Sequence, residues 1–594
     1  MPAPVRPSSA VAGISAQWPW LIVLVGAAVS AADCALWLAV RLANLTGGRG
    51  WTGPAWQLSM VSTAARGGTV LLAPGTSSVL VWTFTALITA GVGGALVPPA
   101  VWVARRVFGR RDPARSMASP HDMRGLTPKP AAANAMRLRP SLAPVASRGD
   151  VAAADRGIAL GRLRPSGPDL TASWEDVILA VMAPRTGKTT CLAVPTILQA
   201  PSWVVATSNK ADLWAATAML RTRVGRVWTF DPQSIVYAER TWWWNPIAGV
   251  RDVASANRLA GHFVQEVRGE RGDRDFWSAA AMDLLTCLLL AAARAGRDIT
   301  QVHAWLADSS NPEAVTILTA AGDTSAAASL RGRQQGASDT REGIFETART
   351  AVQCLSDDAI MRWVTPDANT SSRLEEFDVE RFVIGTDSAY LLSKDGAGAA
   401  APLVAAFSDA IMRAAVAEAE RRGGRIDPPG VIVLDEAANV CRISDLPDLY
   451  SHLGSRGVIP ITILQSYPQG QRVWGEIGMR TLWSAATIKL IGSGLDDARD
   501  AEDISRMIGE EDVDIRSTTW GDGRYSSQLS VRRQRILDAA DVRALPRGTA
   551  ILLATGVRAA LLELRPWYTG PHAAVISAAV LAAEAELTRR ARLH

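Results

Sequence analysis

The chain has 594 residues, of which 48% are apolar and 20% are charged, so we expect two to four domains in a globular protein that also carries membrane sequence. Residues 1–150 have a net charge of +10 and residues 151–594 a net charge of −5, which excludes a general nucleic-acid-binding surface on the larger part. The five cysteines are far apart in the sequence and form no CxxC pair, which argues against a disulfide framework or a zinc site.

Two apolar runs open the chain, at residues 18–40 and 79–103, and each is long enough to cross the ~30 Å hydrocarbon core as a helix. A group of arginines follows the second run: Arg105, Arg106, Arg110, Arg111 and Arg115. By the positive-inside rule, these arginines place everything downstream in the cytoplasm. We therefore expect a two-pass transmembrane hairpin within residues 1–111 of a cell-membrane protein with a cytoplasmic main body.

The first apolar run has an alternative interpretation as a cleaved signal peptide, because Arg6 precedes it and Val29-Ser30-Ala31 resembles a cleavage site. The second run would anchor the protein in either case. Asp33 interrupts the first run and either faces a partner helix or lies near the outer interface. Residues 112–150, rich in Pro, Ala, Ser and Arg, have the composition of a linker.

The sharpest motif is an apolar strand at residues 176–182 that leads through a turn into a helical stretch. The turn and the start of the helix read Ala183-Pro184-Arg185-Thr186-Gly187-Lys188-Thr189-Thr190. A strand, a loop and a helix in this order predict a phosphate cradle, in which Lys188 reaches the β- and γ-phosphates and Thr189 binds Mg²⁺. The first glycine of the GxxxxGK[ST] consensus falls on Met182, so the motif is incomplete.

A second apolar strand, at residues 430–434, ends in the acid pair Asp435-Glu436. This is the pattern of a Walker B strand, where Asp435 would hold Mg²⁺ through water and Glu436 would polarise the attacking water. The structural alternative is a strand that ends in two solvated acids. The Gly-Lys-Thr sequence upstream favours the nucleotide site.

Further strand patterns, at residues 203–207, 227–231, 388–392, 459–464 and 486–491, alternate with helical patterns. This alternation predicts an α/β fold with a parallel sheet that binds ligands at the carboxyl ends of its strands. Residues 151–249 and 381–570 would form this P-loop domain. Residues 250–380 are mostly helical in pattern, residues 515–534 suggest a loop or hairpin, and the Ala-rich segment 571–594 suggests a C-terminal helix.

The order and spacing of several short motifs resemble the TraG/TraD coupling proteins of type IV secretion, in particular their actinobacterial conjugative branch. Besides the phosphate loop, the motifs are Thr207-Ser208-Asn209-Lys210-Ala211-Asp212, Phe230-Asp231-Pro232, Trp244-Asn245-Pro246, Asp275-Phe276-Trp277, Leu434-Asp435-Glu436-Ala437-Ala438-Asn439, Gly454-Ser455-Arg456-Gly457 and Leu464-Gln465-Ser466-Tyr467-Pro468-Gln469. The resemblance covers most of residues 170–570 and the layout of the N-terminal hairpin. It implies a RecA-like domain with an all-α domain inserted at residues 250–380.

The resemblance also implies roles for single residues. Gln465, beside the Walker B strand, would sense the γ-phosphate or orient water. Arg456 resembles an arginine finger that reaches the nucleotide of a neighbouring subunit, and its alternative is a surface arginine beside a glycine turn. Arg185 would contact phosphate or pair with an acid. Lys210 and Asp212 belong either to a polar loop near the nucleotide or to a helix start capped by Ser208.

The resemblance implies a membrane-anchored ATPase that forms a hexameric ring. It would use ATP and Mg²⁺ to move DNA or a relaxase–DNA complex into a secretion channel. Phosphate contacts suffice for such movement. Three alternatives remain: an FtsK-like double-strand translocase, a docking receptor that does not hydrolyse ATP because of Met182, and a protein-secretion ATPase without nucleic-acid cargo.

Overall fold

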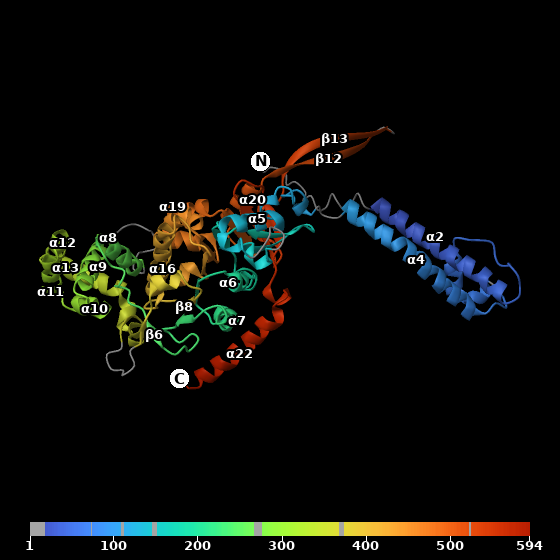
Figure 1. Cartoon of the computed structure of the whole chain (residues 1–594). Coiled ribbons are helices and arrows are strands. Elements are labelled where there is room, and N and C mark those ends of the chain that lie inside the picture. Colours follow the sequence, from blue (N-terminus) through green and yellow to red (C-terminus); the bar gives the residue numbers. More distant parts are fainter. Residues whose placement is uncertain are drawn as a thin grey trace. The chain divides into compact units, whose positions relative to one another are not determined.

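A computed structural model of the chain describes residues 18–72, 74–108, 112–144, 151–265, 276–366, 374–521 and 524–593 (Figure 1). The chain divides into two compact units, residues 1–111 and residues 112–594. The arginines at positions 110 and 111, Asp275, and Asp522-Gly523 of the expected hairpin lie outside the described residues.

The first unit is a pair of long helices, α2 (Trp18–Thr46) and α4 (Ser78–Phe108), that pack against each other. The connection between them contains α3 (Met60–Gly67), whose Met60 joins a small apolar cluster with Leu36 of α2. Asp33 is 1% exposed, and its Oδ1 accepts a hydrogen bond of 2.8 Å from the backbone N–H of Val61. This carboxylate therefore binds the N-terminal turn of α3, within its own unit.

Two helical segments among the described residues are long and apolar enough to cross a membrane, Ala28–Thr46 in α2 and Phe276–Arg294. The segment Ser78–Val92 of α4 is apolar and shorter. Phe276–Arg294 is mostly buried inside the second unit, as expected for a core helix. The two expected spans thus correspond to helices α2 and α4, and their place in a membrane remains a prediction.

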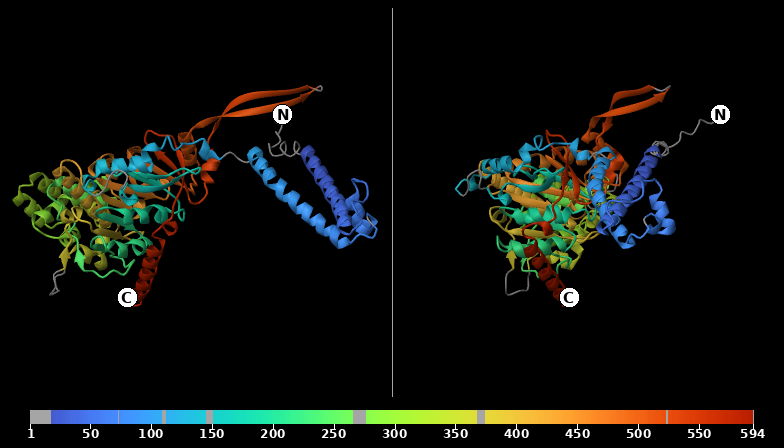
Figure 2. Two further views of the ribbon diagram at one scale, coloured as in Figure 1. Left: turned by 45° about the vertical axis from the view of Figure 1, so that its right-hand side comes forward. Right: turned by 90° about the vertical axis from the view of Figure 1, so that its right-hand side faces the viewer.

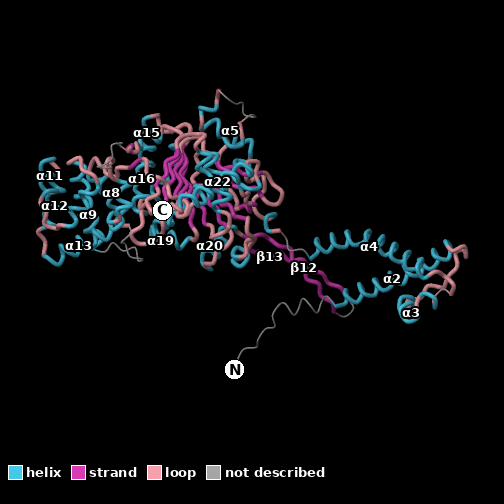
Figure 3. The backbone as a smooth tube through the Cα atoms, turned by 90° about the horizontal axis from the view of Figure 1, so that it is seen from below, coloured by secondary structure: helices cyan, strands magenta, loops and turns pink. Residues whose placement is uncertain are grey.

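The second unit is built on an eleven-stranded sheet with the order β2-β1-β15-β14-β11-β3-β10-β9-β4-β8-β5. The strands are β1 (Ile158–Leu163), β2 (Asp169–Ala172), β3 (Ile178–Val181), β4 (Val204–Ser208), β5 (Val227–Phe230), β8 (Ser388–Leu392), β9 (Gly430–Leu434), β10 (Val458–Leu464), β11 (Ile488–Gly492), β14 (Thr549–Ala554) and β15 (Ala560–Glu563). Figure 3 shows these strands in magenta with helices on both sides.

The seven strands from β11 to β5 are parallel, and they are the seven strands that the sequence predicts. The remaining four strands extend the sheet in antiparallel fashion beyond β11 and were not predicted. Residues of a central strand alternate between two apolar clusters, as Ile178 and Leu179 do. Both faces are therefore buried, which explains why these strands are continuously apolar.

Helices cover both faces of this sheet. They are α6 (Val194–Gln199), α7 (Asp212–Arg221), α16 (Ala401–Arg421), α17 (Ala437–Val440), α18 (Leu446–Leu453), α19 (Tyr467–Ala485), α20 (Ala498–Ile508) and α21 (Ala539–Arg543). The backbone of α19 breaks at Gly475, where φ is 71°. The C-terminal α22 (Ala573–Ala591) contacts α7, so the expected closing helix packs on the sheet domain.

Between β5 and β8 the chain is mostly helical, as the sequence predicts. The helices are α8 (Val253–Val264), α9 (Phe276–Arg294), α10 (Ile299–Ala307), α11 (Glu313–Ala321), α12 (Thr324–Gln334), α13 (Ser338–Ala351), α14 (Asp358–Met361) and α15 (Val379–Val383). Helices α8, α10, α11, α12 and α13 all contact α9. Two short strands, β6 (Trp242–Trp243) and β7 (Glu375–Glu376), pair at the base of this region.

The segment expected to be a linker contains α5 (Pro128–Leu138), which contacts β2. Ala132 and Ala135 of α5 are buried, and the backbone N–H of Ala118 donates to the carbonyl of Ala559. Residues 112–144 are therefore folded against the sheet. The linker composition reflects small side chains that fit closely, not a free chain.

Candidate nucleotide-binding site

The expected phosphate loop connects β3 to a helical segment in the middle of the sheet. The loop ends at Gly187, whose φ of 101° favours glycine, and a wide helical turn over Lys188–Ala193 continues into α6. Thr186 is buried, and its Oγ1 donates to the carbonyl of Ala183 over 2.6 Å. Arg185 is exposed at a φ of 63°. The loop thus lies at the carboxyl end of β3, where ligands bind in parallel sheets.

Met182, which replaces the first consensus glycine, points into the core. It is 1% exposed, and its backbone N–H donates to the carbonyl of Leu464 over 2.9 Å. Its side chain packs against Gly492 of β11, where an added Cβ would lie 2.9 Å from Met182 Cγ. The missing side chain at Gly492 provides room for the methionine, so Met182 does not occupy the phosphate-binding face of the loop.

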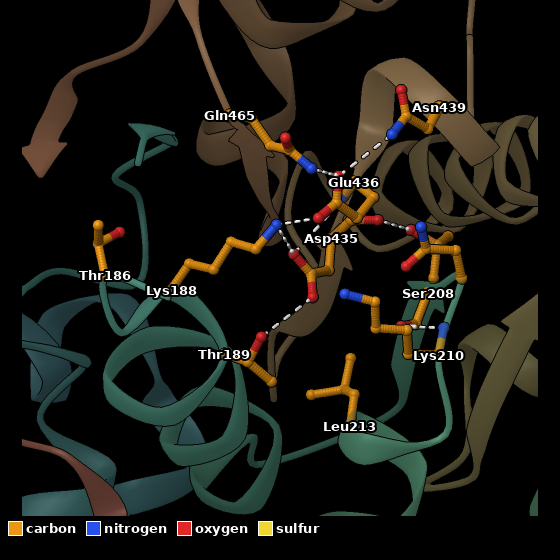
Figure 4. A network of polar contacts seen from close by, with 12 residues as sticks. Thr186, Lys188, Thr189, Ser208, Lys210, Leu213, Asp435, Glu436, Asn439 and Gln465 are labelled. Atoms are coloured by element: carbon orange, nitrogen blue, oxygen red, sulfur yellow. Dashed lines mark hydrogen bonds and ion pairs between the residues drawn. The ribbon is translucent and has the colours of Figure 1, made fainter. Parts of the chain in front are cut away.

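The acid pair Asp435-Glu436 follows β9 and faces the loop (Figure 4). Lys188 forms an ion pair with Glu436 Oε1, and its Nζ lies 3.9 Å from Asp435 Oδ1. Thr189 Oγ1 donates to Asp435 Oδ2 over 3.4 Å. The structure therefore brings together four of the residues that the sequence singles out.

Burial raises the pKa of Asp435 to about 6, and the neighbouring Glu436 adds to this while the Lys188 ammonium opposes it. The carbonyl of Asp435 accepts a 3.1 Å hydrogen bond from Thr207 Oγ1, which fixes the end of the strand. A buried carboxylate beside a threonine hydroxyl is a donor set that suits Mg²⁺. Thr189 and Asp435 are thus the residues that fit a metal ion bound with nucleotide.

A chain of amides holds Glu436. Gln465 Nε2 donates to Glu436 Oε2 over 2.6 Å, and Asn439 Nδ2 donates to the same oxygen over 3.3 Å. Gln469 joins the two, because its Nε2 donates to Asn439 Oδ1 over 2.8 Å and its Oε1 accepts from the backbone N–H of Gln465 over 3.0 Å. Glu436 itself has a φ of 55°, a strained value for a non-glycine residue at a functional site.

Asn439 and Gln469 were named in the sequence only as parts of motifs, without roles. Each lies in the first turn of a helix, α17 or α19, that follows the end of a strand. Their place in the first turn of the helix that follows Glu436 or Gln465 is the signal that points to them, since that turn begins at the carboxyl end of a strand, where ligands bind.

The segment after β4 lies beside the acid pair. Ser208 Oγ accepts a 3.1 Å hydrogen bond from the backbone N–H of Lys210, which supports the interpretation as a capped turn. Figure 4 shows Lys210 next to Asp435 as well, and the charge of Asp212 contributes to the raised pKa of Asp435. The two interpretations of this segment are therefore compatible.

Arg456 lies apart from this site. It precedes β10, whereas Gln465 follows the same strand, so about 20 Å of extended chain separates them. Arg456 Nη2 is 3.3 Å from Glu420 Oε1. Within one chain Arg456 does not reach the nucleotide site, and a catalytic role requires a neighbouring copy.

One segment of the chain matches a known protein family. Residues 429–547, which contain the acid pair and Gln465, match the family model described as the TraM recognition site of TraD and TraG. Through this segment the chain is similar to TraD and TraG. No curated protein matches the chain in sequence. Membership of the actinobacterial branch stays a prediction.

Solved structures of similar fold include the unbound bacterial conjugative coupling protein TrwB lacking its first 70 residues. It matches 68% of this chain and 89% of its own length, with a TM-score of 0.50 and 18% identity. TrwB in complex with the ATP analogue ADPNP matches the same shares at a TM-score of 0.49 and 17% identity, and VirB4 of Thermoanaerobacter pseudethanolicus matches 70% and 97% at 0.40 and 15%. The first likeness confirms the predicted fold class of the sheet domain.

Proposed function

We propose that this protein is a membrane-anchored ATPase that couples ATP hydrolysis to the transfer of DNA, alone or as a relaxase–DNA complex, into a type IV secretion channel. The convergence of Lys188, Thr189, Asp435, Glu436 and Gln465 at the carboxyl edge of the sheet carries the proposal. The match of residues 429–547 to the TraD and TraG family model supports a role in type IV secretion.

Each residue has a role in hydrolysis. The backbone N–H groups of residues 183–190 and the Lys188 ammonium bind the phosphates, and Thr189 and Asp435 hold Mg²⁺, which supplies charge neutralisation when bound. Lys188 leaves Glu436 when it turns to phosphate. Glu436, still held by Gln465 and Asn439, then accepts a hydrogen bond from the attacking water and orients it.

Arg456 completes the site from a neighbouring copy in a ring, which we propose is a hexamer. Its guanidinium would stabilise the charge that develops on the transferred phosphate. Its position at the far end of β10 supports action between copies, since it is remote from its own chain's site. Helices α2 and α4 would anchor this ring in the cell membrane, with residues 112–594 in the cytoplasm.

The test is the ATPase activity of the full chain in nanodiscs, measured without DNA and with single-stranded or double-stranded DNA. We expect DNA to stimulate hydrolysis, and Lys188→Ala and Glu436→Gln to reduce it at least 100-fold. Lys489→Ala is a matched control, because this lysine is remote from phosphate and donates to the carbonyl of Ala486.

Each alternative function predicts a different result. A protein-secretion ATPase would hydrolyse ATP at a rate that DNA leaves unchanged, and an FtsK-like translocase would respond to double-stranded DNA alone. A docking receptor would bind ATP yet hydrolyse it no faster than Glu436→Gln. The buried position of Met182 favours the active enzyme over the docking receptor, because it leaves the loop's phosphate-binding face free.

A further inference from the structure

Two long strands, β12 (Glu510–Gly521) and β13 (Arg524–Arg535), form a hairpin that pairs with no other strand among the described residues. Each strand has 12 residues, which corresponds to about 40 Å, and the hairpin extends away from the sheet domain (Figure 2). An isolated two-stranded ribbon is at best marginally stable in water, and its open edges attract further strands. This hairpin therefore needs a partner that covers its edges.

The two edges of the hairpin carry opposite charges near its base. Strand β12 begins with the acids Glu510, Glu511, Asp512 and Asp514, whereas β13 ends with the bases Arg532, Arg533 and Arg535. The register sets acids against bases, since Glu510 lies opposite Arg535 and Asp512 opposite Arg533. One edge of the ribbon is thus acidic and the other is basic.

Ion pairs within the hairpin leave part of this charge exposed to solvent. Arg533 Nε lies 3.7 Å from Asp512 Oδ1, yet the side chain of Arg533 is 73% exposed and that of Asp512 is 65% exposed. Arg532 is exposed as well. On the same face of β13 as Arg533, Val531 and Leu529 are 65% and 61% exposed. Arg535 pairs with Glu502 of α20, and Glu511 accepts a hydrogen bond from Ser116. At its other positions described above, the hairpin presents charge and apolar surface that its own chain leaves exposed.

We propose that the acidic β12 edge of one copy pairs with the basic β13 edge of the next copy, so that the hairpins of a ring close into one antiparallel collar. Every β12 would then lie between two β13 strands, with Glu510 and Asp512 opposite arginines of their own β13 and facing those of the neighbouring copy. A head-to-tail contact of this kind closes a ring when the rotation between copies fits, and closure removes all free edges. The occupant of each edge is a second copy of this chain.

This inference builds on the proposed ring but is tested without any ATPase measurement, so its failure is distinguishable from failure of the proposed function. Mass photometry of the full chain in detergent reports assembly. Two variants reverse one edge each, Glu511→Arg with Asp512→Arg and Arg532→Glu with Arg533→Glu. Because like charges then face each other between copies, we expect each variant to need about tenfold or more concentration to assemble.

Mixing the two variants separates contacts between copies from contacts within a hairpin. One variant carries two added arginines in β12 and the other two added acids in β13, so the mixture restores opposite charges at the contact between copies and should form rings although neither variant does so alone. Mixing leaves the charges inside each hairpin unchanged, so restored assembly reports pairing between copies. Circular dichroism confirms that each variant is folded. Arg251→Glu, which reverses an arginine that is 80% exposed in the helical insertion, is the matched control and should assemble normally.

Replacement of residues 511–534 by a short Gly-Ser turn gives a second, charge-independent test. We expect this variant to remain folded and to lose rings at concentrations at which the wild type assembles. Unchanged assembly in this deletion, or in both edge variants, would overturn the proposal, and so would edge variants that lose assembly and do not recover it when mixed.

Discussion

Met182 and Gly492 act as a pair across two neighbouring strands. The methionine fills the space that the glycine leaves open, and both lie beneath the phosphate loop. We expect Met182→Ala to lower the free energy of unfolding by about 2–5 kcal/mol through the cavity it creates, while nucleotide affinity changes little. Denaturant unfolding and titration with a fluorescent ATP analogue measure the two effects.

Gly492→Ala tests the same contact from the other side, because its new Cβ would meet Met182 Cγ at 2.9 Å. We expect the single variant to be destabilised and the double variant Met182→Ala with Gly492→Ala to lose less stability than the two single losses together. Additive losses in this double-mutant cycle would show that the two residues do not compensate each other.

Gln465 holds Glu436, the proposed catalytic carboxylate, through a 2.6 Å hydrogen bond. Removal of this amide leaves Glu436 Oε2 with only the longer hydrogen bond from Asn439, and it does not touch the phosphate loop. We therefore expect Gln465→Ala to lower kcat by about 10- to 100-fold and to leave the affinity for ATP within a few-fold of the wild type. Steady-state kinetics together with equilibrium binding separate the two quantities, and an equal loss in both would contradict a role in orienting Glu436.

Helix α20 begins with a group of carboxylates that makes its stability depend on pH. Burial raises the pKa of Asp500 to about 6, and Asp497 and Asp503 add to this. The ionised form of Asp500 is thus disfavoured in the folded state. This lowers the free energy of unfolding fully above pH 6, and the loss disappears as the pH falls toward 3.8. We expect Asp500→Asn to be more stable than the wild type at pH 8, by less than about 1 kcal/mol because the group is half-exposed and screened.

The difference between Asp500→Asn and the wild type should shrink at pH 5, where the wild-type carboxyl is largely protonated when folded. Denaturant unfolding at pH 5 and pH 8 measures this difference in stability. Asp541→Asn, which makes the same substitution at a half-buried acid in the first turn of α21, is the matched control. A constant difference across this pH range would contradict the raised pKa.

Mixing two variants tests whether Arg456 acts in the nucleotide site of a neighbouring copy. Arg456→Ala should lose ATPase activity by 100-fold or more, as expected for an arginine finger. Mixed rings with Glu436→Gln should regain activity, because an intact site in the Arg456→Ala copy can receive Arg456 from its neighbour. No recovery in mixed rings, or full activity of Arg456→Ala alone, would favour the surface-arginine interpretation.

Among the elements, the parallel strands were predictable and the antiparallel ones were not. Strand β9 is an unbroken apolar run because both of its faces are buried. Strands β1 and β15 are short and only partly buried, and they pair residues as distant as Leu163 and Leu562. No local sequence pattern predicts such a pairing. Helix α5 was missed for a similar reason, since its alanines are buried by contact with β2 and show no strong apolar stripe.

In the site, the residues that belong to motifs were predictable, because phosphate and Mg²⁺ demand particular groups at fixed spacing. The sequence therefore identified Lys188 and Asp435, which the structure brings together. The environment of Met182 was not predictable, since it depends on Gly492, which lies some 300 residues away in the chain and is a neighbour only in the folded sheet.

For the whole molecule, the central claim is that ATP hydrolysis in this chain moves DNA. The most direct measurement is displacement of streptavidin from biotinylated DNA by the full chain in nanodiscs, with ATP and Mg²⁺. We predict displacement by the wild type that requires hydrolysable ATP and is absent in Glu436→Gln, although this variant still binds ATP and DNA. If the wild type hydrolyses ATP at an undiminished rate and displaces streptavidin no faster than Glu436→Gln, the protein is not a DNA motor.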